Sequence, residues 1–510
     1  MRSCFIGIIC FFGCCSFAKA EEILDQEIQL PKTRETTYEL LNRITDLTGF
    51  FFIYDSDVIR NEKKIKFSGG KHTLRQSIYL ITQNQNIQIK VMGRHILLYK
   101  KEALPSSVSK SVPIINDSLT YVVAKAMVKD AQTQEPIPHV SASIAETGIG
   151  TITNQSGEFM LKIPLSDSTQ YIQISHVGYN QQIIPVELFR NNPVDIYMQT
   201  KIIPLEEVII GLVNPQKIIR EMLNNKPINY QKDPVYFTAF YREGIEKKNT
   251  LISLTEAVFQ IYKTGFESSA NDQVKLLKMR KISNEDEHDS LIVKMRAGID
   301  ASLRLDIIKY IPDFLDLSNE PPFIYTKIDM TVTDSSLAHV IAFEQKPGIA
   351  EPFYKGELYI DAENSALLAA HFEVDPRYID KATDIFVLKK PKGVDIKPEN
   401  ASYYVYYKYW NGKYYLNHIR GDVTFKMKKK NILFQPSKSI HIFFEMVVCK
   451  IDTCDVKRFP RKESISTRTV FSETKFHYDN RFWDDFNVIL PEKELNEAIT
   501  RISSKIEEME

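Results

Sequence analysis

The sequence predicts an α+β protein of several domains: a small α+β module, a β-sandwich, and a large, mainly antiparallel β domain with a few helices. Three observations support this fold class. Apolar stripes at helical spacing alternate with short strand patterns over residues 21–101, whereas residues 120–200 hold short strands separated by turn signals. Residues 214–510 hold longer strand patterns arranged as successive hairpins, which is typical of an antiparallel sheet.

The composition is that of ordinary globular protein. The chain has 510 residues, of which 43% are hydrophobic and 25% are charged, so there is enough apolar mass for several cores. Lys+Arg and Asp+Glu each number 65, which makes the formal charge zero. A protein that follows a phosphate backbone needs an excess of basic residues. We therefore expect no nucleic-acid partner.

Residues 1–20 have the pattern of a secretory signal peptide. Arg2 precedes an apolar run, and Ala18-Lys19-Ala20 provides a small-x-small cleavage site. The run is too short to cross a bilayer, which takes about twenty residues. An alternative is a lipoprotein signal, in which Phe11–Cys14 is the motif and Cys14 carries the lipid. Both alternatives predict export to the periplasm or the outer membrane, and no later segment is apolar enough for a transmembrane helix.

Residues 21–101 predict a compact α+β module. Apolar residues from Leu40 to Leu47 recur at helical spacing, and Gly49 marks the expected end of that helix. Thr73 opens a second expected helix, whose apolar stripe includes Ile78. With the strand patterns around them, the helices form two half-repeats, the second of which ends in a hairpin.

This order of elements resembles the secretin and TonB short N-terminal domain. The resemblance is carried by the closing hairpin and by Leu40–Ile44, Thr48-Gly49, Phe52–Asp55 and Thr73–Ile78. In that family the domain is a periplasmic protein-interaction module, which often passes a signal from an outer-membrane receptor to an anti-sigma regulator. The resemblance implies an envelope protein as partner, such as a component of the TonB system, a receptor or a regulator of that kind.

Residues 102–119 form a predicted linker, because they are rich in serine and proline and show no periodicity. Short strands then recur over residues 120–200, among them Tyr121–Val128 and Phe159–Ile163. Asn154–Gly157 is a turn signal between two of them, since Asn and Gly tolerate positive φ. The regular spacing predicts an antiparallel sandwich.

The same residues resemble the carboxypeptidase regulatory-like domain, a transthyretin-like β-sandwich. The resemblance is carried by Val128–Asp130, Glu135–Pro138, Thr147–Thr151, Asn154–Phe159 and Val177–Tyr179. The sequence departs from the family at His139, where Gly or Asn is usual. The family's regulatory module carries no catalytic residues, and none of the ten histidines begins the His-x-x-Glu motif of zinc carboxypeptidases. We expect no peptidase activity.

The two modules in tandem resemble the N-terminus of Bacteroidota TonB-dependent transporters of the outer membrane. Pro204–Ile210, within a second predicted linker at residues 201–213, resembles the segment that leads to the plug of those proteins. A full transporter barrel has about 22 strands of about ten residues, or roughly 220 residues before loops and plug. Residues 214–510 are too few for a full transporter. A smaller barrel would fit the length, but the helices expected in this region favour a globular domain, so we expect neither plug nor barrel.

Residues 214–510 instead predict a β-rich domain of unknown function. Pro215–Leu223 and Ile299–Phe314 are expected helices, and Asn411-Gly412 predicts a type I′ hairpin turn. The strand at Lys355–Asp361 and its return strand at Leu367–Val374 resemble the half-barrel of bacterial lipoprotein carriers.

Tyrosine and tryptophan side chains crowd the hairpin around that turn. We single out Tyr404, Tyr406, Trp410 and Tyr414 as a candidate ligand surface, because such rings stack on sugars or hold apolar ligands. The alternative is that the hairpin is buried and these residues belong to the core.

Cys449 and Cys454 are the only cysteines outside the first fifteen residues. In an exported protein, two cysteines that flank a four-residue turn predict a disulfide. Free thiols and a metal site are the alternatives, although two ligands alone do not make a zinc site. We predict no catalytic, cofactor-binding or metal-binding residues, because no nucleophile elbow, phosphate loop or dinucleotide motif is present.

These observations lead to the hypothesis of a non-enzymatic cell-envelope protein that acts through protein contacts, associated with a TonB-dependent uptake or signalling system. The alternative is a lipid- or glycan-binding carrier built on a curved C-terminal sheet. A continuous apolar hollow beneath that sheet would favour a carrier, whereas a filled core would argue against it. An enzyme of unrecognised type is a third hypothesis.

Overall fold

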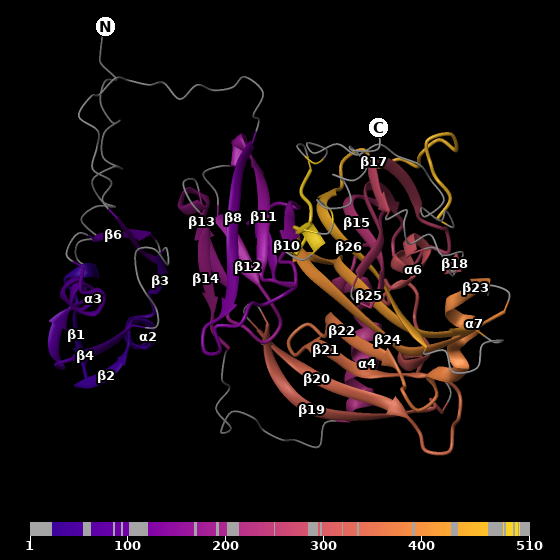
Figure 1. The fold of residues 1–510 in the computed structure, drawn as a ribbon, viewed down its shortest axis with the longest axis horizontal. Helices are drawn as coiled ribbons and strands as arrows, with labels where there is room; N and C mark the ends of the chain where they lie inside the picture. Colours follow the sequence, from indigo (N-terminus) through magenta and orange to yellow (C-terminus); the bar gives the residue numbers. More distant parts are fainter. Residues whose placement is uncertain are drawn as a thin grey trace, which may run out of the picture. The chain divides into compact units, whose positions relative to one another are not determined.

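The structure is a computed structural model, drawn in Figure 1. It describes residues 23–54, 63–84, 87–92, 95–100, 121–167, 171–189, 193–200, 214–248, 250–283, 294–295, 298–318, 320–333, 336–389, 393–429, 437–467, 483, 486–492, 495–497 and 499. The predicted signal peptide, and Cys14 with it, lies outside the described residues. The chain is mostly β, with a large antiparallel sheet and few helices, which confirms the α+β class.

The first module contains short strands around two helices. Its elements are β1 (Glu27–Leu30), β2 (Thr33–Thr36), α2 (Thr37–Thr48), β3 (Phe51–Tyr54), β4 (Lys64–Phe67), β5 (Gly70–Thr73), α3 (Leu74–Thr82), β6 (Ile87–Met92) and β7 (His95–Lys100). β1 pairs with β5, β2 pairs with β4, and β7 lies between β3 and β6. The apolar faces of both helices meet in a core of this module's own, which includes Leu40, Ile44 and Ile78.

Both helices begin where the sequence provides a capping box. Thr36 and Glu39 bond to each other's backbone N–H groups at the start of α2, and Thr73 and Gln76 do the same at the start of α3. α2 ends at Gly49 in the left-handed conformation, as predicted. Local sequence therefore determines the bounds of these helices.

The second module is a sandwich of two sheets. Its strands are β8 (Tyr121–Asp130), β9 (Ser141–Ile144), β10 (Gly150–Ile152), β11 (Glu158–Pro164), β12 (Tyr171–Ser175), β13 (Gln182–Pro185) and β14 (Val194–Met198). One sheet has the order β10-β9-β12-β13 and the other β11-β8-β14. At the predicted turn, the Asn154 side chain accepts the backbone N–H groups of Ser156 and Glu158, and Gly157 has φ 74°.

The third module is built on a ten-stranded antiparallel sheet of order β17-β16-β15-β26-β25-β24-β22-β21-β20-β19. Its strands are β15 (Val235–Lys247), β16 (Thr250–Lys263), β17 (Gln273–Ser283), β19 (Phe323–Thr333), β20 (Ser336–Gln345), β21 (Tyr354–Asp361), β22 (Leu367–Val374), β24 (Val394–Trp410), β25 (Lys413–Lys429) and β26 (Lys438–Asp452). β18 (Lys294–Met295) pairs with β23 (Val387–Lys389). The helices are α4 (Pro215–Asn224), α5 (Lys226–Asn229), α6 (Gly298–Arg304) and α7 (Thr383–Phe386).

The large sheet is curved, as Figure 1 shows, and an apolar core packs against it. Side chains far apart in the strand order, such as Phe259 of β16 and Phe343 of β20, belong to one buried cluster. Ile219 and Met222 of α4 enter the same cluster from the concave side. The helix predicted over Ile299–Phe314 ends early, at Arg304, and the following residues bury Phe314 against Phe343 in a short 3₁₀ turn.

The opposite, outer face of β15, β16 and β26 is covered as well. Phe240 and Val447 pack there against Ile489 from the end of the chain and against Ile152 of the sandwich. The Thr151 hydroxyl donates to the Val488 carbonyl at 3.3 Å. Residues Val128–Ile163, Gln170–Ile183 and Met198–Glu510 belong to one compact unit, so part of the sandwich and the large sheet share a core.

Candidate functional site

The structure separates the four aromatic residues of the candidate ligand surface. Tyr404 and Tyr406 lie on the outer face of β24, since their neighbours Tyr403 and Val405 belong to the core on the inner face. The register of β24 and β25 shifts between Tyr406 and Tyr407, because β25 holds one extra residue there, Asn417. The alternation of faces is therefore reversed on β25, where Ile419 and then Leu416 belong to the core, whereas it continues on β24.

Trp410 and Tyr414 lie beyond this bulge and are not part of the same surface. Tyr414 is buried in the core, where its hydroxyl accepts the Asn364 side chain at 3.1 Å. Trp410 packs against the core, and its indole N–H donates to the Glu146 carbonyl at 3.4 Å. The predicted hairpin turn itself is confirmed, because Asn411 and Gly412 both have positive φ.

Tyr404 and Tyr406 instead form one wall of a cavity of about 560 Å³. The opposite wall comes from loops of the sandwich, so both modules contribute to it. The lining residues are Asp130, Thr133, Glu135, Pro136, Ile137, Pro138, His139, Gln155, His176, Tyr179, Ser402, Tyr404, Tyr406, Arg420 and Asp422.

Asp130 and Tyr179 form a fixed polar pair on the sandwich side of this cavity. The Tyr179 hydroxyl donates to Asp130 Oδ2 at 2.9 Å, and Asp130 Oδ1 accepts the backbone N–H groups of Gln132 and Thr133. Burial opposes ionisation of Asp130, but these hydrogen bonds outweigh it and lower its pKa. Burial and the neighbouring carboxylate raise the pKa of Tyr179 to about 12. The cavity therefore holds a carboxylate here at neutral pH.

Two histidines beside the tyrosines are uncharged at neutral pH. Burial lowers the pKa of His176 to about 4, and it lowers the pKa of His371 to about 4 as well. The His371 ring lies 5.1 Å from the Tyr404 ring and 5.2 Å from the Tyr406 ring, between centroids. These contacts hold the two tyrosines in a rigid aromatic group.

A chain of charged groups crosses the outer face of β25 and β26 at the floor of the cavity. Arg420 donates two hydrogen bonds to Asp422, at 2.8 and 2.9 Å, and Asp422 also bonds to His441 at 3.0 Å. His441 bonds on its other side to Glu246, at 3.0 Å. These two carboxylates raise the pKa of His441 to about 9, against the effect of burial.

His139, His418 and Glu445 meet at the end of this chain. The His418 Nε2 atom lies 2.9 Å from Glu445 Oε1, and the His139 Nδ1 atom lies 3.8 Å from the same oxygen. The two imidazole rings are stacked, with centroids 4.8 Å apart. Their ligand atoms and that of Glu445 all lie within 4.8 Å of one another. Sequence reasoning did not find this group, because its members are 27 to 306 residues apart.

Burial and neighbouring charges set the charge states of His139 and Glu445. Burial, the neighbouring His418 and Arg420 hold the pKa of His139 well below its usual value, despite the opposing effect of Glu445. Burial would raise the pKa of Glu445, but the His418 hydrogen bond and the Arg420 charge outweigh it and lower that pKa strongly. A neutral imidazole thus faces an ionised carboxylate.

One signal for His139 was present in the sequence. His139 has φ 61°, in the left-handed region that Gly and Asn occupy most easily, which explains why those residues are usual at this position. Its imidazole lies 3.8 Å from Glu445 and stacks on the His418 ring, a contact between rings that neither Gly nor Asn could make.

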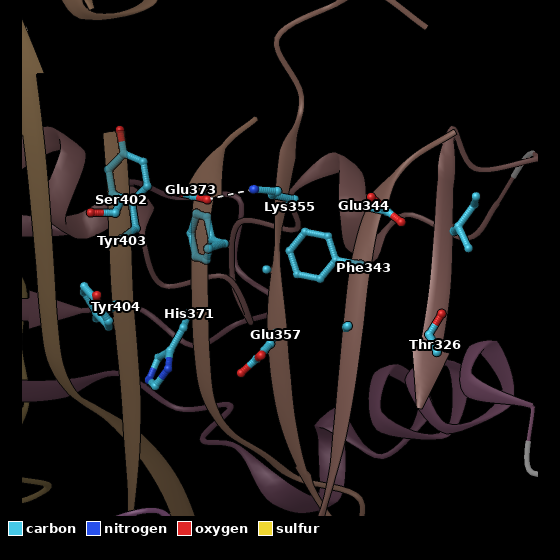
Figure 2. A pocket seen from close by; sticks show the side chains of 14 residues that line it. Thr326, Phe343, Glu344, Lys355, Glu357, His371, Glu373, Ser402, Tyr403 and Tyr404 are labelled. Atoms are coloured by element: carbon cyan, nitrogen blue, oxygen red, sulfur yellow. Dashed lines mark ion pairs between the residues drawn. The ribbon is translucent and has the colours of Figure 1, made fainter. Parts of the chain in front are cut away.

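A second cavity, of about 410 Å³, lies on β19, β20, β21, β22 and β24 and shares Ser402 and Tyr404 with the first. Figure 2 shows its charged side chains along neighbouring strands, with Lys355 paired to Glu373 at 3.1 Å. Glu344 and Glu357 add further negative charge to its lining. The two cavities thus adjoin at Tyr404.

The predicted disulfide between Cys449 and Cys454 is absent, and both cysteines are free thiols. Cys449 lies within β26, buried beside Val447, and its thiol donates to the Asn487 carbonyl at 3.2 Å. Cys454 follows the strand in an exposed turn. The prediction was wrong because β26 continues to Asp452, so the two residues do not face each other across a hairpin.

Comparison with known proteins identifies one module. Residues 126–210 match the family described as the CarboxypepD_reg-like domain, which confirms the resemblance of the sandwich. No curated protein matches the chain. In the described part of the chain, the helices are all too short or too polar to cross a bilayer.

Solved structures show only distant likeness. A domain of an outer membrane lipoprotein-sorting protein from Vibrio parahaemolyticus is 8% identical, and the alignment covers 48% of this chain and 95% of that one with a TM-score of 0.20. A LolA superfamily protein from Nitrosomonas europaea is 10% identical, with 49% of this chain and 96% of that one covered and a TM-score of 0.17. Scores this low carry no functional conclusion.

Proposed function

We propose that this protein is a cell-envelope binding protein that holds a polar, sugar-like ligand in the cavity between the sandwich and the large sheet. One observation carries the proposal: aromatic and charged side chains from both modules converge on one cavity. Its volume of about 560 Å³ is within the range of about 300–1,000 Å³ that small-molecule sites have.

The chemistry of the lining suits a sugar. A sugar ring offers apolar C–H faces, which tyrosine rings such as Tyr404 and Tyr406 contact well, and a rim of hydroxyl groups. Asp130, Asp422 and Arg420 provide charged hydrogen-bonding groups for such hydroxyls. Because hydrogen bonds within the protein already hold these side chains in place, they lose little conformational entropy when the ligand binds.

An apolar lipid is a poorer match for the described residues. The concave side of the large sheet is occupied by the core around Phe314, Phe343 and Met222. Both cavities described above contain charged side chains, whose desolvation by an acyl chain would be unfavourable. Of the two carrier ligands considered from the sequence, we therefore favour the glycan.

Calorimetric titration with a panel of neutral and acidic oligosaccharides tests this proposal. Tyr404→Ala removes one ring from the cavity wall, and we expect it to weaken binding by about tenfold, as the loss of a stacking contact of about 1–1.5 kcal/mol would. Tyr409→Ala is the matched control, because Tyr409 lies on the same strand, is 58% exposed and does not line the cavity. The proposal fails if no oligosaccharide binds, or if both variants bind as the unchanged protein does.

We further propose that the ligand is held without chemical change and without an organic cofactor. The support is that the sequence contains no recognised nucleophile, phosphate-loop or dinucleotide motif. Chromatography of the bound oligosaccharide after prolonged incubation should return it intact. Shortened products would identify the protein as an enzyme.

A second candidate function, protein contact, is favoured by the first module. Residues 27–100 have their own buried core, and Leu47 and Leu80 of the two helices are exposed, as on a surface that contacts another protein. We propose that this module resembles the secretin and TonB short domain in binding a TonB-system component, an outer-membrane receptor or an anti-sigma regulator, after export to the periplasm or the outer membrane. Cross-linking in the native envelope, with and without residues 21–101, should recover such a partner only with the module. Recovery of identical proteins from both would contradict it.

A further inference from the structure

We propose that His139, His418 and Glu445 form a binding site for a divalent transition-metal ion such as Zn²⁺ at the floor of the cavity. This inference is independent of the sugar-like ligand. Two imidazoles and a carboxylate are donors that Zn²⁺ and its neighbours in the first transition row prefer. The three come from a sandwich loop, β25 and β26, so the folded chain alone brings them together.

The separations of the ligand atoms suit one ion after a small adjustment. Zinc bonds to nitrogen and oxygen are about 2.0–2.1 Å long, so tetrahedral ligand atoms lie roughly 3.3 Å apart. The His418–Glu445 separation of 2.9 Å would lengthen slightly, and the His139–Glu445 separation of 3.8 Å would shorten by a similar amount. Small rotations of both imidazole rings, which stack at an interplanar angle of 24°, would make these changes and draw together the ligand atoms, which already lie within 4.8 Å of one another.

An unsatisfied buried atom provides a second, independent observation. The His139 Nδ1 atom is buried, points toward Glu445 and has no hydrogen-bond partner among the described residues. Buried polar atoms are normally paired, so an unpaired one at a cluster of metal-ligating groups indicates a missing ligand. On the other side of the ring, the amide nitrogen of Gln155 lies 3.2 Å from His139 Nε2. With its amide oxygen turned to accept Nε2–H, Gln155 would leave the Nδ1 lone pair directed at the ion.

The surrounding charges also permit a cation. Arg420 lies 3.8 Å from Glu445, but its positive charge is balanced by the carboxylate of Asp422, to which it donates two hydrogen bonds. Because both imidazoles bind metal in their neutral form, Glu445, Asp422 and Arg420 together leave one negative charge. Asp130 and Glu135 add further negative charge to the cavity lining.

Three protein ligands leave a coordination position open. Closed structural zinc sites have four protein ligands, whereas sites that exchange water or a ligand have three. Because His139 also lines the cavity, the open position faces the space that the sugar-like ligand would occupy. The site therefore resembles the exchangeable kind, and the ion could bind a hydroxyl of a ligand directly.

Titration with Co²⁺ and Zn²⁺ tests the site. The full chain is purified without a histidine tag, stripped with a chelator and titrated with Co²⁺ alone, whose visible absorption reports tetrahedral imidazole and carboxylate ligation. We expect one equivalent to bind and Zn²⁺ to displace it. His139→Asn keeps a residue that tolerates positive φ, and Glu445→Gln keeps the shape of the side chain. Each should weaken binding by more than about 100-fold, because even changes outside the ligand set cost about 10–100-fold.

His441→Gln is the matched control, since His441 also bonds two carboxylates on the outer face but is not part of the cluster. It should bind Co²⁺ as the unchanged protein does. Circular dichroism confirms that each variant is folded, and because two ligands are tested separately, the failure of one variant to fold still leaves the other. The proposal is overturned if the unchanged protein binds no Co²⁺ tightly, or if folded His139→Asn or Glu445→Gln binds it equally well.

Discussion

His441 is the residue whose protonation is most clearly linked to stability. Asp422 and Glu246 bond to its two ring nitrogens and raise its pKa to about 9, while Arg420 and the Phe443 ring complete its surroundings. A raised pKa means that the folded protein binds the proton more tightly than the unfolded chain, whose histidine titrates near about 6.5. This contribution to stability is complete below about pH 6.5 and is lost as the pH rises through about 9.

His441→Gln should therefore destabilise the protein more at pH 6 than at pH 10. At pH 6 we expect a loss of about 1–2 kcal/mol, less than the whole shift implies because the side chain is 31% exposed. Urea unfolding at the two pH values measures the difference. Equal losses at both would show that the ring contributes through packing and not through its charge.

Glu256 should be among the residues least tolerant of substitution. It is 1% exposed, bonds to Arg242 at 2.8 Å and to Arg280 at 2.5 Å, and has its pKa lowered by these two guanidinium groups against the effect of burial. Glu256→Gln leaves two buried positive charges without a counter-charge, so we expect a loss of about 3–5 kcal/mol in the free energy of unfolding.

The control for this prediction is Glu399→Gln, which breaks an exposed ion pair with Lys426. Exposed pairs contribute about 0–1 kcal/mol, so that variant should unfold almost as the unchanged protein does. Urea unfolding of both variants measures the two losses in the free energy of unfolding. Similar small losses would mean that water reaches the Arg242–Glu256–Arg280 group.

At the scale of elements, β25 and β26 depend on a glycine beneath an aromatic ring. Gly421 faces Phe444 across the two strands, and a Cβ atom at Gly421 would lie 2.4 Å from the Phe444 ring. Gly421→Ala should therefore destabilise the protein by about 1–3 kcal/mol through overpacking. Phe444→Leu together with Gly421→Ala should recover part of that loss, because the two changes act on one contact. If thermal unfolding shows that the stability losses of the two single variants simply add in the double variant, the contact between residues 421 and 444 is not the source of the strain.

Comparison of the predicted helices, turns and disulfide with the structure shows which features the sequence predicts correctly. Capping boxes, the Gly49 helix end and the Asn411-Gly412 turn depend on residues close in the chain, and each was found where local chemistry predicted it. The helix at Ile299–Phe314 was predicted too long, because apolar spacing cannot distinguish a helix from turns that bury the same residues. The disulfide prediction was wrong for a similar reason, since the spacing of two cysteines does not show where a strand ends.

At the scale of the whole molecule, part of the sandwich and the large sheet should unfold together. Ile152 of the sandwich is fully buried in a cluster with Phe240, Val447 and Ile489 of the third module. Ile152→Ala should cost about 2–5 kcal/mol. Both tryptophans, Trp410 and Trp483, lie in the third module, so their fluorescence reports its unfolding.

We expect Ile152→Ala to shift the tryptophan unfolding transition of the whole third module to lower denaturant, as a single transition. The exposed Ile183→Ala, on β13 of the sandwich, is the control and should leave the transition in place. A tryptophan transition unchanged by Ile152→Ala would mean that the two modules unfold independently.

The sequence by itself determined the α+β class, the sandwich and the caps and turns, because these follow from periodicity and from contacts within a few residues. The candidate site required the tertiary structure. His139, His418 and Glu445 are distant in the chain, and the extra residue that β25 holds opposite Tyr406 and Tyr407 turns Tyr414 toward the core, away from the surface of Tyr404 and Tyr406. A one-residue shift of register exchanges the faces of a strand, and only the pairing of strands in the folded chain sets that register.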